Sequence, residues 1–440
     1  MTVTLVRPSK LDRLPDLTRA SPDGPGLQRG NAEWTAIVAL IAAFIFQPIL
    51  HPTGPGNTSP VDLLIVATIV TGAIWARSGH HKLRAPYFIP VALMVAAGAA
   101  SGIVSALPGL ALSTLAIDLL LFAWCTAVVN LVTSPRAMRY AMAAWSWAGI
   151  FWATVVVAAW LGHVPAIEGL QAADGNRVLF TFGDPNYAAT YWVVTIFVVF
   201  ASGTPKAKWM RFTGYIMLGS ALALSESNGG VLAFGLGILF LLSVRAYRRR
   251  GLVGSLAVVL VAALGIGLLL TVFPLSQVRQ QALNSGQPLL VNSIGRSGQS
   301  TSERHELEVE LLQLYRQSDG IVGLGPGSTK PLLTTQNAPY PNEAHNDSLA
   351  MLSERGVVGL LGLLLLVGTA TFWAAPLVRR PLSPGFAAAV PRPAGLVAAL
   401  LALALISYYE EVLHFRFLWG LLAIVAVLGK DARRKTVTHA

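Results

Sequence analysis

Residues 229–273 read GGVLAFGLGILFLLSVRAYRRRGLVGSLAVVLVAALGIGLLLTVF, two apolar runs separated by a short basic segment. Each run approaches the ~20 residues that an α-helix needs to cross the hydrocarbon core of a bilayer. Because Lys and Arg collect in the cytoplasmic loops of membrane proteins, the basic segment also indicates orientation. The stretch therefore predicts two membrane spans, 229–244 and 252–273, joined on the cytoplasmic side.

The composition of the whole chain agrees with a membrane protein. Of its 440 residues, 54% are hydrophobic and only 12% are charged, whereas soluble proteins carry about 25% charged residues. The single cysteine, Cys125, lies in an apolar run, which excludes a disulfide framework and a thiolate metal site. Residues 1–32 show no apolar core followed by a cleavage site, so we expect a cytoplasmic tail rather than a signal peptide.

Apolar runs along the rest of the chain predict an all-α integral membrane protein with about twelve transmembrane helices and both termini in the cytoplasm. The candidate spans are residues 33–50, 61–76, 86–107, 111–133, 138–161, 187–202, 210–224, 229–244, 252–273, 346–371, 394–409 and 413–429. The prediction divides the chain into a cytoplasmic tail (1–32), nine helices (33–274), a long extracytoplasmic loop (275–345), three helices (346–429) and a second cytoplasmic tail (430–440).

The basic residues support this topology. Of the 32 Lys and Arg residues, 24 fall in the two tails or in alternate loops, all on one side of a twelve-span chain. The formal net charge of +11 therefore reports orientation and does not indicate a nucleic-acid partner. The exceptions are Arg177, Arg279, Arg296, Arg304, Arg316, Lys330, Arg355 and Arg416.

Five of these exceptions lie in the loop 275–345, which is too long to be a simple connection. Its segment 303–316, ERHELEVELLQLYR, has apolar residues at 307, 311, 314 and 315, the spacing of an amphipathic helix. Two placements stay open for this helix, against the membrane surface or as a charged cap over the bundle. Four neighbouring acidic residues also leave open that Arg304 is only ion-paired.

Two further features of the loop carry possible chemistry. Residues 320–330, GIVGLGPGSTK, lack the Gly-Lys-Ser/Thr order of a nucleotide-binding loop, although a turn whose N–H groups face an anion stays possible. His345 directly precedes the span 346–371, where the helix dipole is expected to keep its ring neutral and able to accept a proton. A capping or packing role is the alternative for this histidine.

In their order, the polar segments of the outward side resemble the O-antigen ligase/polymerase family of polytopic glycan transferases. The resemblance covers about residues 180–420 and rests on Gly183-Asp184-Pro185-Asn186, Ser227-Asn228-Gly229-Gly230, Arg304 ahead of Gly323-Leu324-Gly325-Pro326-Gly327, His345-Asn346 leading into Glu354-Arg355-Gly356-Val357-Val358-Gly359-Leu360, and Arg416-Phe417-Leu418-Trp419. Singly, each segment is also typical of a turn, a helix start or an interfacial anchor.

The resemblance implies an inverting glycosyltransferase of the bacterial cytoplasmic (inner) membrane that uses no metal or other cofactor. It would transfer a glycan from an undecaprenyl- or decaprenyl-diphosphate carrier to a hydroxyl of a glycan or glycolipid acceptor, at the extracytoplasmic face. His345 would be the catalytic base and Arg304 would bind the donor diphosphate. The resemblance adds Arg177, Asn228 and Arg416 as further donor-binding residues and Asp184, Asn186, Glu343 and Asn346 as supporting residues.

One position departs from the family, because Asn228 stands where many relatives carry an arginine. Either the donor is held with fewer charges, or Arg177, Arg296 or Arg416 takes over. A polymerase of lipid-linked repeats is the nearest alternative, and a transporter or flippase of lipid-linked substrates is a second one. Against transport, no repeated halves are visible, and Asp118 is the main ionisable residue inside the spans.

Overall fold

The structure is a computed structural model that describes residues 26–51, 58–79, 81–169, 177–317 and 321–437. Within these ranges the ordered elements are helices, without a β-strand, which confirms the predicted all-α class. The helices that correspond to the predicted spans are α1 (Gly26–Ile45), α2 (Pro60–Ser78), α3 (Phe88–Val104), α4 (Pro108–Leu131), α5 (Pro135–Gly162), α7 (Pro185–Ser202), α8 (Lys208–Leu224), α9 (Asn228–Val272), α14 (Asp347–Arg379), α16 (Ala394–Ile406) and α17 (Arg416–Val437). Short helices α6 (Pro165–Glu168) and α15 (Pro384–Ala389) connect them.

Membrane-length helices recur along the chain. Five of the described helices, α2, α4, α5, α9 and α14, are long and apolar enough to cross a bilayer, and shorter apolar helices occur at 30–45, Phe88–Val104 and Ala394–Ile406. A multi-helix membrane protein is therefore supported. The count of twelve spans and the side on which each terminus lies stay predictions.

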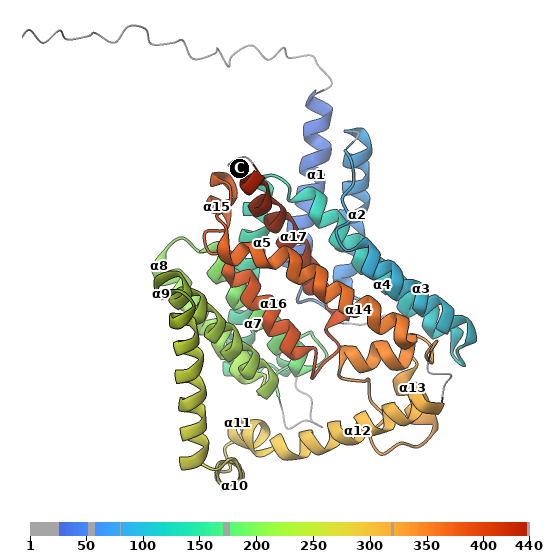
Figure 1. Cartoon of the computed structure of the whole chain (residues 1–440), viewed down its shortest axis with the longest axis vertical. Helices are drawn as coiled ribbons and strands as arrows, with labels where there is room; N and C mark the ends of the chain where they lie inside the picture. The colour runs from blue at the N-terminus through green and yellow to red at the C-terminus, as the bar shows by residue number, and fades with distance from the viewer. Residues whose placement is uncertain (1–25, 52–57, 80, 170–176, 318–320, 438–440) are drawn as a thin grey trace, which may run out of the picture.

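The two spans predicted at 229–273 are two helices that meet at Gly251 and together form α9. The arginines expected in a connecting loop are helical, and only Gly251 leaves the helical conformation, with φ 64° and ψ −156°. This left-handed value suits glycine, which has no Cβ to clash there. After the bend, the second half of α9 descends to α10 (Leu275–Asn284), beside the start of the long loop (Figure 1).

Much of the described part of the long loop is helical. After α10 come α11 (Pro288–Leu290), the π-helix η3 (Val291–Gly295), α12 (Ser297–Gln317) and α13 (Thr329–Thr335). The predicted amphipathic helix is therefore part of α12, which lies along one end of the bundle (Figure 1). Its apolar stripe, Leu307, Leu311 and Leu314, is buried in a small core with Leu333 of α13 and with the start of α14. The structure thus favours the cap over the bundle, because the stripe packs on protein.

The glycine-rich turn 323–327 is held by α14. Glu354 accepts hydrogen bonds from the backbone N–H of Gly327 (2.7 Å) and from the hydroxyl of Thr329 (2.8 Å). The N–H groups of Leu324 and Gly325 donate to the backbone carbonyls of Ser353 and Glu354, so the N–H groups that a phosphate would need are already bonded within the chain. α14 bends two residues after Glu354, at Gly356 (φ 65°, ψ −166°). The residue between Glu354 and Gly356, Arg355, forms an ion pair with Asp118 at 2.5 Å.

α7 lies at the centre of the bundle and positions the candidate site. It packs against α5, α8, α9 and α16 and is buried on almost all of its faces. Asp184 caps its N-terminus, with the Oδ1 atom accepting from the N–H groups of Asn186 (2.6 Å) and Tyr187 (3.2 Å). Because this end is capped and packed, Asn186 in the first turn is held at a defined place near α12.

Candidate active site

Two of the polar residues predicted from the sequence, Asn186 and Arg304, meet where several helix ends converge beneath α12. The first turns of α7 and α9, the segment after α16 and one side chain of α12 surround a small hollow. Its lining consists of Asn186, Thr190, Ser227, Gly229, Gly230, Arg304, Ile406, Tyr409 and Glu410. Residues that are more than 200 positions apart in the sequence therefore share one site.

His345 contacts this site through Glu410. The Nδ1 atom of His345 lies 3.0 Å from Oε2 of Glu410, and the side chains are 25% and 9% exposed. The other ring nitrogen, Nε2, has no hydrogen-bond partner among the residues that the structure describes. A carboxylate that holds one nitrogen fixes the ring orientation, which leaves the second nitrogen for a substrate.

Asn186 connects the His345–Glu410 pair to the rest of the site. Its Nδ2 donates to Oε1 of Glu410 at 2.8 Å, while its Oδ1 accepts from the hydroxyl of Ser227 at 2.7 Å. The same Oδ1 accepts from Nη2 of Arg177 at 3.1 Å, and Nε of Arg177 donates to the carbonyl of Ser225. The structure thus brings the predicted residues Arg177 and Asn186 into one network with His345.

The electrostatics of His345 differ from the sequence prediction of a neutral ring. Burial lowers the pKa of His345, but the charge and hydrogen bond of Glu410, with further contributions from Asp184 and Glu411, outweigh it and raise the pKa to about 9. The resting ring is therefore protonated at neutral pH. Burial and the neighbouring Glu410 in turn raise the pKa of Asp184 to about 6, although His345 opposes this.

Arg304 presents a positive charge to the hollow. Its guanidinium carbon lies 5.5 Å from the centre of the Tyr409 ring, a cation–π contact. Within the described part of the chain, Arg304 forms no ion pair and no hydrogen bond, so the neighbouring acidic residues of α12 do not neutralise it. A half-buried guanidinium of this kind is suited to an anionic ligand.

The other predicted residues lie around the hollow without lining it. Asn228 donates to the carbonyl of Ser293 in η3 at 2.9 Å, and Asn346 caps α14 by accepting from Ser348 and Leu349. Glu343 is exposed. Donor binding by Asn228 and the supporting roles of Asn346 and Glu343 stay predictions.

Arg416 occupies a buried ion pair at the start of α17. Its Nη2 and Nε atoms contact both carboxylate oxygens of Asp62 in α2, at 2.7 Å and 3.0 Å. This bidentate pair joins α17 to α2 and gives Arg416 a structural role. Binding of the donor by Arg416 stays a prediction.

The sequence prediction did not include Glu410, the carboxylate on which the site depends, or its neighbours. Glu411 accepts from the backbone N–H of Ala344 at 2.8 Å and so fixes the chain beside His345. Tyr408-Tyr409-Glu410-Glu411 is a polar segment between two apolar runs, and that contrast was an available signal. Within the described ranges, no three His, Cys, Asp or Glu side chains are grouped to hold a metal ion.

Comparison with known families agrees with the resemblance. Residues 213–364, from α8 into α14, match the family described as O-Antigen ligase. The matched segment contains Arg304 and His345, whereas Asn186 and Glu410 lie outside it. No curated protein matches the chain. The match supports the O-antigen ligase family and a membrane glycosyltransferase-like function.

Proposed function

We propose that this protein of the O-antigen ligase type transfers a glycan from a polyprenyl-diphosphate carrier to an acceptor hydroxyl at the extracytoplasmic face of the membrane. The observation that carries the proposal is one hollow in which the unpaired guanidinium of Arg304 and the Glu410 carboxylate that holds His345 both take part. Such a site offers a cation for a leaving diphosphate and a positioned imidazole for a hydroxyl.

In the proposed reaction, the acceptor oxygen attacks the anomeric carbon of the donor as the bond from that carbon to the diphosphate oxygen breaks. The single displacement inverts the anomeric configuration. The acceptor hydroxyl loses its proton to His345, and the negative charge that develops on the diphosphate is stabilised by Arg304. Asn186 and Glu410 keep the imidazole oriented throughout.

The protonated resting ring has a consequence for this mechanism. Because the pKa of His345 is raised to about 9, only about 1% of the sites hold the neutral ring at pH 7. Base catalysis therefore becomes faster as pH rises towards 9 and levels off above it. The high pKa also makes the neutral ring a stronger base than an ordinary histidine.

A transfer assay with the purified chain in liposomes tests the proposal, using a polyprenyl-diphosphate-linked oligosaccharide as donor. We expect His345→Ala to lose at least the roughly 10²-fold that a general base contributes, whereas His305→Ala, an exposed histidine of α12, keeps full activity. We expect Arg304→Ala to weaken donor binding, with exposed Arg316→Ala as its control. Normal transfer by His345→Ala would refute the mechanism.

The same assay distinguishes the alternatives. A ligase adds one donor glycan to a foreign acceptor, whereas a polymerase of lipid-linked repeats gives a ladder of products from the donor alone. For a transporter or flippase, Asp118 was the main ionisable residue inside the spans, and Arg355 engages it in an ion pair. Movement of the donor across the liposome membrane without new glycosidic bonds would favour transport.

A further inference from the structure

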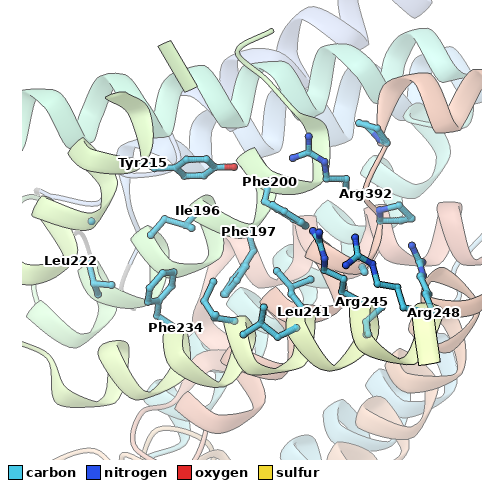
Figure 2. A pocket seen from close by; sticks show the side chains of 18 residues that line it. Ile196, Phe197, Phe200, Tyr215, Leu222, Phe234, Leu241, Arg245, Arg248 and Arg392 are labelled. Atoms are coloured by element: carbon cyan, nitrogen blue, oxygen red, sulfur yellow. The ribbon is translucent and has the colours of Figure 1, made fainter. Parts of the chain in front are cut away.

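A large groove lies away from the candidate active site, between α7, α8, the first half of α9 and the start of α16. Its volume is about 830 Å³, and 18 side chains line it (Figure 2). A volume of this size accommodates a large part of a lipid molecule. The groove shares no lining residue with the hollow beside Arg304.

The groove has two chemically different ends. Ile196, Leu222 and Phe234 form an apolar end, while Arg245, Arg248 and Arg392 gather at the other end (Figure 2). Arg249 also belongs to the basic end, and no Asp or Glu lines the groove. Four guanidinium groups are therefore gathered without a carboxylate in the lining.

The positive charge of the basic end is not neutralised within the described residues. Arg245 and Arg249 form no ion pair or hydrogen bond there, and Arg392 lies over the Phe200 ring at 5.1 Å. Arg248 donates to the carbonyl of Val378, a neutral partner. Cations clustered in this way repel one another, so an anion at this end would be held by several charges.

The spacing of the two ends fits one leaflet of a bilayer. The eleven-residue separation of Phe234 and Arg245 along α9 corresponds to about 17 Å at 1.5 Å per residue. This is about half of the ~30 Å hydrocarbon core. The basic end also belongs to the side that the positive loops predict to be cytoplasmic, where anionic lipid headgroups are found.

We propose that the groove binds an anionic glycerophospholipid of that leaflet. The phosphate is held by Arg245, Arg249 and Arg392, and an acyl chain lies between α7, α8 and α9. The glycan donor is a different ligand, because its diphosphate is expected at Arg304, near the opposite end of the first half of α9. Ser227 and Arg245 are separated by about 27 Å along this helix, so the lipid site does not depend on the proposed transferase function.

Native mass spectrometry of the full chain in detergent tests this site with three probes: phosphatidylglycerol, phosphatidylcholine with the same acyl chains, and a polyprenyl monophosphate. We expect phosphatidylglycerol to bind at least tenfold more tightly than phosphatidylcholine. Each arginine contributes roughly fivefold, so the triple substitution R245Q/R249Q/R392Q should weaken phosphatidylglycerol binding about 100-fold. R77Q/R139Q/R379Q, three exposed arginines outside the groove, should leave it unchanged.

A second variant tests the apolar end without removing charge. Gly219 lines the groove, and a Cβ built on it has no atom within 4 Å, so Gly219→Leu should fold normally and fill the space that an acyl chain would occupy. We expect it to reduce binding at least tenfold, whereas Gly235→Leu, with equally open space outside the groove, keeps it.

Two results would overturn the assignment. Equal binding of phosphatidylglycerol and phosphatidylcholine would show that the arginines do not select an anion. The second result is displacement of phosphatidylglycerol by polyprenyl monophosphate. If the triple substitution also abolished binding of the polyprenyl monophosphate, the groove would be a binding site for the donor carrier.

Discussion

Replacing Glu410 by glutamine tests how the candidate site controls the proton on His345. The substitution keeps the size of the side chain and removes the negative charge 3.0 Å from Nδ1. Because the charge and hydrogen bond of Glu410 are the main causes that raise the pKa of His345, we expect that pKa to fall from about 9 towards the ordinary 6.5. Asp184 and Glu411 remain, so the new value should lie between these limits.

The magnitude follows from these two values. Their difference corresponds to roughly 3 kcal/mol between the two protonation states. The neutral fraction of the ring at pH 7 would rise from about 1% towards three quarters if the pKa returned fully to 6.5. The same stabilisation of the charged ring contributes to folding below pH 6.5 and is lost as pH rises through about 9, because the folded-state pKa is the higher one.

The assay is the initial rate of glycan transfer at saturating donor between pH 6.5 and 10. We expect the parent rate to rise about tenfold per pH unit and to level off near pH 9. In Glu410→Gln, the plateau should begin one to two pH units lower and should itself be lower, because the ring is less well oriented. The titration of Asp184, with a pKa of about 6, lies below this window.

Two outcomes would refute the reasoning. An unchanged pH profile in Glu410→Gln would mean that this carboxylate does not control the ring. A parent rate that falls as pH rises through 9 would mean that the charged ring stabilises the leaving diphosphate, and that the neutral ring does not deprotonate the acceptor. Glu306→Gln, which removes an exposed carboxylate of α12, is the matched control for the loss of one negative charge.

Two structural features carry further predictions. Gly356→Ala should lower the free energy of unfolding by about 3 kcal/mol or more, since a Cβ there would overlap the carbonyl oxygen of Ile321 and φ is 65°. Gly368→Ala, with open space in the same helix, should leave the free energy of unfolding unchanged. Equal melting temperatures of the two variants in detergent would contradict this. Asp62→Asn should cost about 3–5 kcal/mol because it leaves Arg416 buried without its carboxylate. Thermal unfolding of Asp62→Asn, Arg416→Gln and the double variant measures the coupling, and strictly additive losses would exclude the pair.

The sequence predicted the helical class well because a membrane span is a local property. A run of apolar residues of sufficient length is recognisable without knowing its neighbours. The two predicted spans at 229–273 are present as two helices, but the basic segment before Gly251 is helical and not a loop, because a single glycine with a positive φ can reverse the chain. For α12 the stripe was visible, but its partner was not, since Leu333 is distant in sequence from Leu307.

The site was predictable in part, because a polar residue in a long loop is also recognisable from the local sequence. Arg304 and His345 stand out as polar residues in a long loop, and the structure places Arg304 in the hollow and His345 beside it. The contact of His345 with Glu410 joins residues 65 positions apart, and that of Arg416 with Asp62 joins residues 354 positions apart. No local pattern encodes such pairs. The prediction of a neutral His345 ring was wrong because it did not include Glu410, the carboxylate that raises the pKa of the ring.

The bend at Gly251 also determines where the loop that carries Arg304 begins. The second half of α9, residues 252–272, is about 30 Å long at 1.5 Å per residue, close to the thickness of a bilayer core. This helical segment begins at Gly251, on the far side of the molecule from α12, and ends at α10 (Figure 1). Its length therefore determines the position of α10 and of the chain that leads to α12. Deleting one helical turn from the second half of α9 would move α10 by about 5 Å towards the membrane. The position of Arg304 therefore depends on a helical segment that does not line the hollow.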